Sequence, residues 1–171
     1  MDILDRLLGH DAWTTRQLIL QSLGLSDTQL DRRFPIGHGS LRETFAHIIG
    51  NTEAWTDLIN QRPIRPRPAS KATSIAQLIA RHDAASTEFA AVARRLQDQG
   101  RLDDLFVDTA DDPPALKTFG GAIVHLVTHS MHHRAQVLNI MRQLGMTDLI
   151  EGDALGWERR QRPGGWPRHG G

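Results

Sequence analysis

Residues 74–96 read SIAQLIARHDAASTEFAAVARRL, and the fold is decided in this stretch. Its apolar positions and one histidine follow each other in alternating steps of three and four, the spacing of a seam between packed helices. These positions are Ile75, Leu78, His82, Ala85, Phe89, Val92 and Leu96. Ser74-Ile-Ala-Gln77 is a capping box that can begin the helix, and Gly100 can end it. The stretch predicts a long helix inside a bundle.

Three further segments carry helical periodicity, whereas strand-type alternation is scarce. They cover about residues 2–24, 41–60 and 116–144. The second begins at the capping box Ser40-Leu-Arg-Glu43 and ends before a proline-rich run. An acidic connection, residues 101–116, precedes the last segment. We therefore predict an all-α fold, a four-helix bundle with long crossover connections.

The domain organisation follows from the absence of a repeat or a second periodic region. We expect residues 1–158 to form a single bundle domain. Residues 159–171 are rich in glycine, arginine and proline, and we expect them to form a mobile C-terminal tail.

The composition excludes several classes of protein. Among 171 residues, 20 lysines and arginines balance 20 aspartates and glutamates, so electrostatics gives no reason to expect nucleic acid or anionic membrane as a partner. The absence of cysteine excludes disulfides, thiolate ligands and a cysteine nucleophile. No apolar run approaches the roughly 20 residues of a membrane span, and the N-terminus lacks a signal-peptide core. We expect a cytoplasmic protein.

The last helical segment contains a cluster of histidines, His125-Leu-Val-Thr-His129-Ser-Met-His132-His133. On a helical wheel, His129 and His133 point toward the bundle interior, whereas His125 and His132 lie on the flank. Histidines at i and i+4 can bind one metal ion together, and neutral imidazole is a common ligand of zinc, nickel and iron. Gln136 lies beside His129 and His132 on the wheel and is a candidate hydrogen-bond partner of a ligand.

Two ligands make a weak site, so we expect a third from another helix. His47 lies at the margin of the buried face of the second helix and is the first candidate. Glu43, one turn earlier, is a candidate fourth ligand or general base. His82 and His10 compete for the role, but a lone histidine is more often a hydrogen-bonded core or boundary residue, and we prefer that interpretation for both.

The sequence excludes two known kinds of metal site. A zincin needs His-Glu-x-x-His, and a di-iron bundle needs two Glu-x-x-His motifs; neither occurs here. Three histidines with one open position is the ligand count of a catalytic zinc site. On spacing alone, a chance cluster in a histidine-rich helix remains the alternative. His38 and His169 lie in glycine-rich stretches, and we expect both to be solvated.

Three stretches of the chain together resemble the DinB-like family, also called the DinB/YfiT-like metalloenzymes. The first is Gly39-Ser-Leu-Arg-Glu-Thr-Phe-Ala-His47-Ile with Glu53-Ala-Trp55 after it. The second is His129-Ser-Met-His132-His133-Arg-Ala-Gln136, and the third is Gly152-Asp-Ala-Leu-Gly-Trp157-Glu. The resemblance spans about residues 2–158 in order and spacing.

The resemblance implies a four-helix bundle that holds one divalent metal ion, zinc or nickel, through His47, His129 and His133. It also implies a homodimer. Related enzymes are thiol-dependent, namely bacillithiol transferases and the mycothiol-dependent maleylpyruvate isomerase, in which the metal activates a low-molecular-weight thiol.

The functional hypothesis that follows is a metal-dependent enzyme of the thiol S-transferase type. Because the chain has no cysteine, any thiol must arrive as a small-molecule substrate. We expect Glu43 or Gln136 to orient the bound species and Asn51 and Trp55 to line the pocket, while Arg134 plays a structural role or contacts a second subunit. A metal-dependent hydrolase and a non-catalytic metal- or ligand-binding stress-response protein are the alternatives.

Overall fold

The structure, a computed structural model, describes residues 1–69, 73–150 and 152–161. Four long helices make up most of it, which confirms the predicted all-α bundle. They are α1 (Ile3–Gln21), α3 (Leu41–Ile59), α4 (Ile75–Asp98) and α5 (Phe119–Gln143). Ser40 and Ser74 cap α3 and α4 as predicted, each accepting a hydrogen bond from a backbone N–H three residues later.

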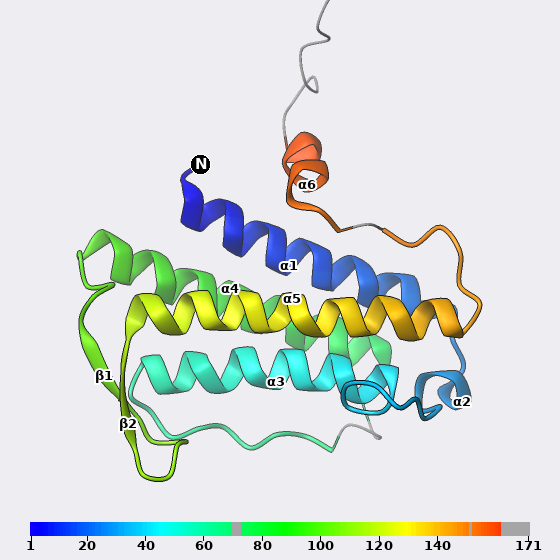
Figure 1. Ribbon diagram of the computed structural model, residues 1–171, viewed down its shortest axis with the longest axis horizontal. Coiled ribbons are helices and arrows are strands. Elements are labelled where there is room, and N and C mark those ends of the chain that lie inside the picture. The colour runs from blue at the N-terminus through cyan, green and yellow to red at the C-terminus, as the bar shows by residue number, and fades with distance from the viewer. Residues whose placement is uncertain (70–72, 151, 162–171) are drawn as a thin grey trace, which may run out of the picture.

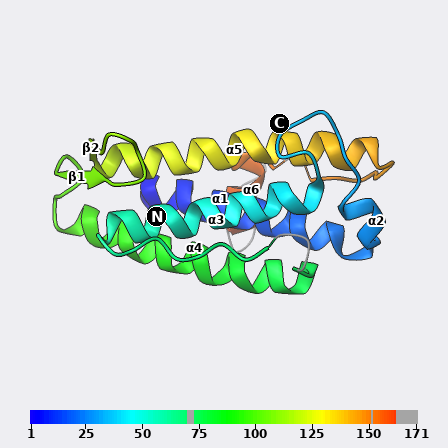
Figure 2. The same cartoon turned by 90° about the horizontal axis from the view of Figure 1, so that it is seen from below.

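The helices α1 and α3 each pack against both α4 and α5. Although α1 and α3 are consecutive long helices in the sequence, they therefore lie at diagonally opposite corners of the bundle. Figure 2 shows α4 and α5 on opposite sides with α1 and α3 between them. The chain after α3 returns along the bundle before α4 begins, and α3 and α4 therefore run in the same direction (Figure 1). This connection between α3 and α4 is a long crossover of the kind that the sequence predicts, whereas α1 and α3, and likewise α4 and α5, are joined at one end of the bundle.

The core is divided into two apolar clusters, one toward each end of the bundle. Representative buried side chains are Leu18, Phe45, Leu78 and Ile140 in the first cluster and Leu8, Phe89, Phe119 and Leu126 in the second. Polar groups lie between the clusters: Arg134 is buried there, forms an ion pair with Asp11 and donates to Thr15 Oγ1 at 3.3 Å. Arg134 is thus structural within the subunit, as predicted.

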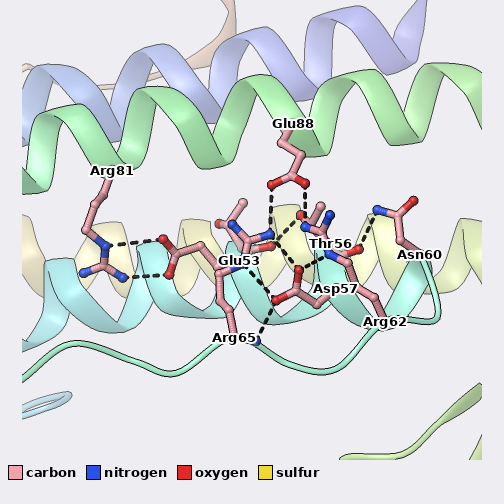
Figure 3. A network of polar contacts seen from close by, with 9 residues as sticks. Glu53, Thr56, Asp57, Asn60, Arg62, Arg65, Arg81 and Glu88 are labelled. Atoms are coloured by element: carbon pink, nitrogen blue, oxygen red, sulfur yellow. Dashed lines mark hydrogen bonds and ion pairs between the residues drawn. The ribbon is translucent and has the colours of Figure 1, made fainter.

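A polar network fixes the connection after α3 to the bundle (Figure 3). The carboxylate of Asp57, only 1% exposed, accepts hydrogen bonds from Arg62 Nε at 2.5 Å and from Arg65 N and Nε, both at 2.9 Å. Arg65 also donates to Glu88 on α4 at 2.9 Å. Burial alone would raise the pKa of Asp57, but the arginine hydrogen bonds outweigh it and hold the pKa well below its usual range. Asp57 therefore anchors the connection as a charged group.

The predicted acidic connection, residues 101–116, needs correction, because it contains part of a β-hairpin. Strands β1 (Leu105–Asp108) and β2 (Ala115–Thr118) pair antiparallel, with Leu105 opposite Thr118. Thr118 accepts a hydrogen bond from Gly121 N and so caps α5, which begins at Phe119 rather than near residue 116. The hairpin lies beside the start of α5 (Figure 1).

Short helices supplement the bundle: η1 (Ser22–Gly24), α2 (Asp27–Leu30) and α6 (Ala154–Gln161). Trp157 of α6 is buried against α1, where a Cβ on Gly9 would lie 2.6 Å from the indole. Residues 159–161 of the predicted tail belong to α6, while 162–171, including His169, lie outside the described residues, so the mobile tail stays a prediction. None of the described helices has the length and apolar character that a membrane span requires.

Candidate metal centre

The candidate metal centre arises from an antiparallel ladder between α3 and α5. Moving four residues forward on α3 corresponds to moving four residues back on α5, because both helices present one face at this interval. The facing pairs are His47 with His133, Asn51 with His129, and Trp55 with His125. The ladder explains how histidines about 80 residues apart in the sequence converge on one another.

The structure brings the three sequence-predicted ligands together. The ring centroid of His47 lies 4.5 Å from that of His133 and 5.2 Å from that of His129, and the latter two centroids are 4.4 Å apart. Nε2 of His133 is 3.3 Å from Nε2 of His129. Two nitrogen ligands of a tetrahedral zinc, at about 2.0–2.1 Å each, stand about 3.3 Å apart. The α5 pair therefore has the spacing of ligands to one metal ion.

Gln136 fixes the orientation of His133. Its Oε1 lies 2.8 Å from His133 Nδ1, and an amide oxygen only accepts, so the imidazole carries its proton on Nδ1 and keeps a lone pair on Nε2. The amide nitrogen of Gln136 lies 2.8 Å from Nε2 of His132. Gln136 thus contacts both a candidate ligand and a flanking histidine. An acceptor for the second ring N–H is the usual means by which a protein orients a metal-binding imidazole.

Asn51 contacts His129 in the opposite sense. Its amide nitrogen lies 3.2 Å from His129 Nδ1 and donates to it, so in this arrangement the ring proton is on Nε2, which lies 3.3 Å from His133 Nε2. Coordination through His129 Nε2 requires the proton to be on Nδ1 instead, and after a half-turn of the Asn51 amide its oxygen can accept a hydrogen bond from that Nδ1–H group. The predicted pocket residue Asn51 is therefore in direct contact with a candidate ligand.

His47 tests whether these residues fit a metal. Its Nε2 is buried and has no hydrogen-bond partner among the described residues. Buried polar atoms are nearly always partnered, and leaving one alone costs about 1–3 kcal/mol. The lone nitrogen belongs to a ring that contacts two further imidazoles. A cation bound in their midst supplies the missing partner, so the donor set fits a metal such as zinc or nickel.

The protonation states also suit metal binding. Burial lowers the pKa of His47 to about 3, and repulsion from neighbouring imidazoles adds to this. Burial likewise lowers the pKa of His129 to about 4, and it lowers the pKa of His133. All three rings are neutral at pH 7, which is the form that ligates a metal.

One member of the cluster was missed at the sequence level. His38 is exposed, as expected of a glycine-rich loop, but its ring stacks on His47 with centroids 3.6 Å apart and lies 5.1 Å from the ring of His133. One ring nitrogen from each of His38, His47 and His133 lies within 4.8 Å of the others, close enough for one metal ion. His129 is not part of this group: its Nε2 lies 3.3 Å from that of His133, but its ring centroid is 5.2 Å from that of His47.

Glu43 lies at the edge of the centre. Its carboxylate forms an ion pair with Arg33. Together with His38, His47 and Arg67 it lines a cavity of about 200 Å³. Glu43 thus lies beside the histidines, where its carboxylate can contact a molecule that enters the cavity.

A larger pocket adjoins the centre on the side of the β-hairpin. Its volume is about 620 Å³, and Asn51, Trp55 and His125 form its helical wall. From the hairpin, Lys117 contributes its ammonium group, which lies 5.2 Å from the centroid of the Trp55 ring and pairs with the buried carboxylate of Asp108 at 2.5 Å. The pocket therefore offers an aromatic face and fixed charges next to the Asn51–His129 pair.

The competing histidines lie elsewhere. A ring nitrogen of His10 is 2.6 Å from the carbonyl oxygen of Gly152, and His82 is buried with Nδ1 at 3.4 Å from Asp83. Both are thus hydrogen-bonded boundary or core residues, as preferred from the sequence.

The protein is thus a bundle of four long helices with neutral histidines gathered between α3 and α5. This combination places it in the class of candidate helical metalloproteins. The family model of the DinB superfamily matches residues 13–137. The chain therefore belongs to the DinB superfamily, as the sequence motifs predict.

Solved structures agree with this assignment. A DinB-like protein from Bacillus cereus is 20% identical, with a TM-score of 0.60 over 81% of this chain and 89% of that one. YfiT from Bacillus subtilis, described as "a probable metal-dependent hydrolase with an unusual four-helix bundle topology", is 20% identical, with a TM-score of 0.65 over 86% of this chain and 91% of that one. A search of curated proteins finds no match. At this identity the likeness concerns the fold.

Proposed function

We propose that the protein is a divalent-metal-dependent enzyme whose metal is held by His47, His129 and His133 and activates a small nucleophile. The observation that carries the proposal is the buried Nε2 of His47, which has no hydrogen-bond partner among the described residues and belongs to a ring beside those of His129 and His133. Three helix-borne ligands leave one position for an exogenous molecule. A bound divalent metal lowers the pKa of a water or thiol in that position.

The nucleophile that we favour is a low-molecular-weight thiol, which makes the protein a thiol S-transferase. The chain contains no cysteine, so the sulfur must come from a small-molecule substrate. The pocket of about 620 Å³ would hold the electrophile, with Trp55 against its apolar part and Lys117 near its polar part. Asn51 would orient both His129 and the reacting group, because it lines the pocket and touches that ring.

A metal-dependent hydrolase is the second candidate, and the description of YfiT favours it. The two activities would use the same metal and differ in the nucleophile, water in place of a thiol. We also propose, from the family resemblance, a homodimer in the cytoplasm, which sedimentation of the purified protein and fractionation of the producing cell would test.

Metal analysis of the purified protein tests the metal site. His47→Ala and His129→Ala should each lose most of the bound zinc or nickel. His125→Ala and His132→Ala serve as matched controls, because they remove imidazoles of α5 that lie outside the proposed ligand set, and they should keep the metal. Full stoichiometric metal in both ligand variants would refute the proposal.

A turnover screen of the metal-loaded protein then separates the activities. Consumption of an electrophile that depends on an added thiol supports the transferase. Hydrolysis of esters or amides without thiol supports the second candidate instead. A protein that binds metal but turns over neither set would be a metal-binding protein without this catalysis.

A further inference from the structure

His38 is the histidine of the cluster that no helix carries. It lies between α2 and α3, and its ring covers one face of His47 with only 25° between the two planes. Its nitrogen is within 4.8 Å of ligand atoms on both His47 and His133. No hydrogen bond holds the His38 ring among the described residues, so the ring can turn toward a bound metal without breaking one.

The loop that carries His38 is built against the centre. Gly37 has φ +56°, and a Cβ at that position would collide with Oε1 of Gln136, the same atom that orients His133. Gly39 has φ +85° and accepts a hydrogen bond at 2.7 Å from the backbone N–H of Phe34, whose side chain is buried. Because only glycine adopts these conformations readily, the two glycines fix His38 over His47.

We infer that His38 is a fourth ligand of the metal, supplied by this loop, and that it leaves to admit the substrate. The inference rests on the proposed function. A zinc with four protein ligands is closed, whereas three ligands leave a reactive position. His47 and His133 are fixed on helices and shielded, while His38 is exposed on a loop. His38 is therefore the ligand that can exchange with a thiol or water without any movement of a helix.

The alternative role for His38 is an aromatic cover that shields His47 without touching the metal. Both roles place the ring on His47, but only coordination changes the number of nitrogens around the metal. The number of metal ligands is therefore the quantity that decides between them.

The test uses the full chain loaded with Co²⁺, which replaces zinc in nitrogen-ligand sites and reports its coordination number through visible absorption. The variants are His38→Ala and, as a matched control, His132→Ala, which removes another exposed imidazole at the edge of the cluster. His47→Ala tests the metal site itself. Each protein is examined by its cobalt spectrum, by chelator competition and by titration with 2-mercaptoethanol.

We expect His38→Ala to bind Co²⁺ more weakly by at least the roughly tenfold factor that loss of an outer-shell partner causes. Its spectrum should change in intensity as solvent replaces the imidazole, and it should bind 2-mercaptoethanol more tightly than the wild type, because no ligand has to leave. The control should match the wild type. A His38→Ala spectrum identical to wild type, while His47→Ala loses cobalt, would overturn this inference and leave the proposed function standing. A wild type that binds no cobalt would refute both.

Discussion

His47 differs from His129 and His133 because neither an amide nor another ring forms a hydrogen bond with its Nε2 among the described residues. Amide groups engage Nδ1 of His133 and of His129, which directs the Nε2 atoms of these two rings toward each other. Nε2 of His47 is buried without any hydrogen bond among the described residues. At the scale of single residues, the site therefore consists of two oriented rings and one ring whose buried nitrogen lacks a partner.

The role of Gln136 gives the first prediction. Gln136→Met removes the acceptor at His133 Nδ1 and keeps a side chain of similar size, so His133 loses its fixed tautomer. We expect metal affinity to fall about 10- to 100-fold, as is usual for loss of an outer-shell partner, while the protein stays folded. Chelator competition measures the affinity. Gln143→Met, an exposed glutamine on the same helix that bonds to Asn139, is the control. Equal affinities in the two variants would contradict the prediction.

The lowered pKa values predict how the metal-free protein responds to acid. The pKa of His47 falls from an ordinary 6.5 to about 3 on folding, and that of His129 falls to about 4. Between pH 6.5 and these lowered pKa values, the histidines bind protons in the unfolded chain but not in the folded chain. The free energy of unfolding therefore falls as the pH drops from about 6.5 toward 3.

Urea denaturation in the presence of a chelator, at pH 7 and at pH 4.5, measures this dependence. His47→Gln removes the group with the larger shift, and we expect its stability to change less with pH than that of the wild type. His125→Gln should follow the wild type. An equally steep pH dependence in His47→Gln would show that His47 is not the source.

At the scale of elements, hydrophobic periodicity predicted the long helices correctly but did not predict the β-hairpin between α4 and α5. The alternating steps from Ile75 and the serine caps place the helix starts of α3 and α4 correctly. The hairpin escaped because strands of four residues are too short to establish an alternation, and Leu116 and Lys117 continue the helical pattern of α5 backwards. The cap at Thr118 is what ends the strand and begins the helix.

The same reasoning explains which part of the site could be foreseen. His129, His133 and His47 lie on helices, where a wheel gives the direction of each side chain. His38 lies on a loop whose course depends on positive φ angles at Gly37 and Gly39 and on contact with α5. A local pattern does not contain that contact, although glycines on both sides of a histidine nine residues before His47 were its visible sign.

The network around Asp57 gives a prediction about an element, the connection after α3 (Figure 3). Arg65→Ala removes two side-chain hydrogen bonds from a carboxylate that is 1% exposed, although Arg62 remains. We expect a loss of about 1–3 kcal/mol in the free energy of unfolding. Arg101→Ala, which breaks a pair with the exposed Asp104, should cost less than about 1 kcal/mol. Urea denaturation of both variants compares them, and equal losses would contradict a role for Asp57 as the anchor.

At the scale of the whole molecule, the division of the core accounts for the position of the metal centre. Apolar clusters hold the bundle together toward its two ends, which leaves a polar level between them. The ion pair of Arg134 with Asp11 occupies the α1 side of that level, and the histidines occupy the α3 side. A metal that joins α3 to α5 at this level should therefore contribute to the stability of the entire bundle.

Thermal unfolding tests that coupling. A ligand that binds only the folded state at 100 times its dissociation constant stabilises it by about 2.7 kcal/mol. For a chain of this size each kcal/mol raises Tm by about 2–4 °C, so zinc or nickel at that level should raise the Tm of the wild type by about 5–10 °C. His129→Ala should lose most of this rise at the same metal concentration, and His125→Ala should keep it. An undiminished rise in His129→Ala would mean that His129 is not a ligand of the stabilising metal, because His38, His47 and His133 would then hold it without His129.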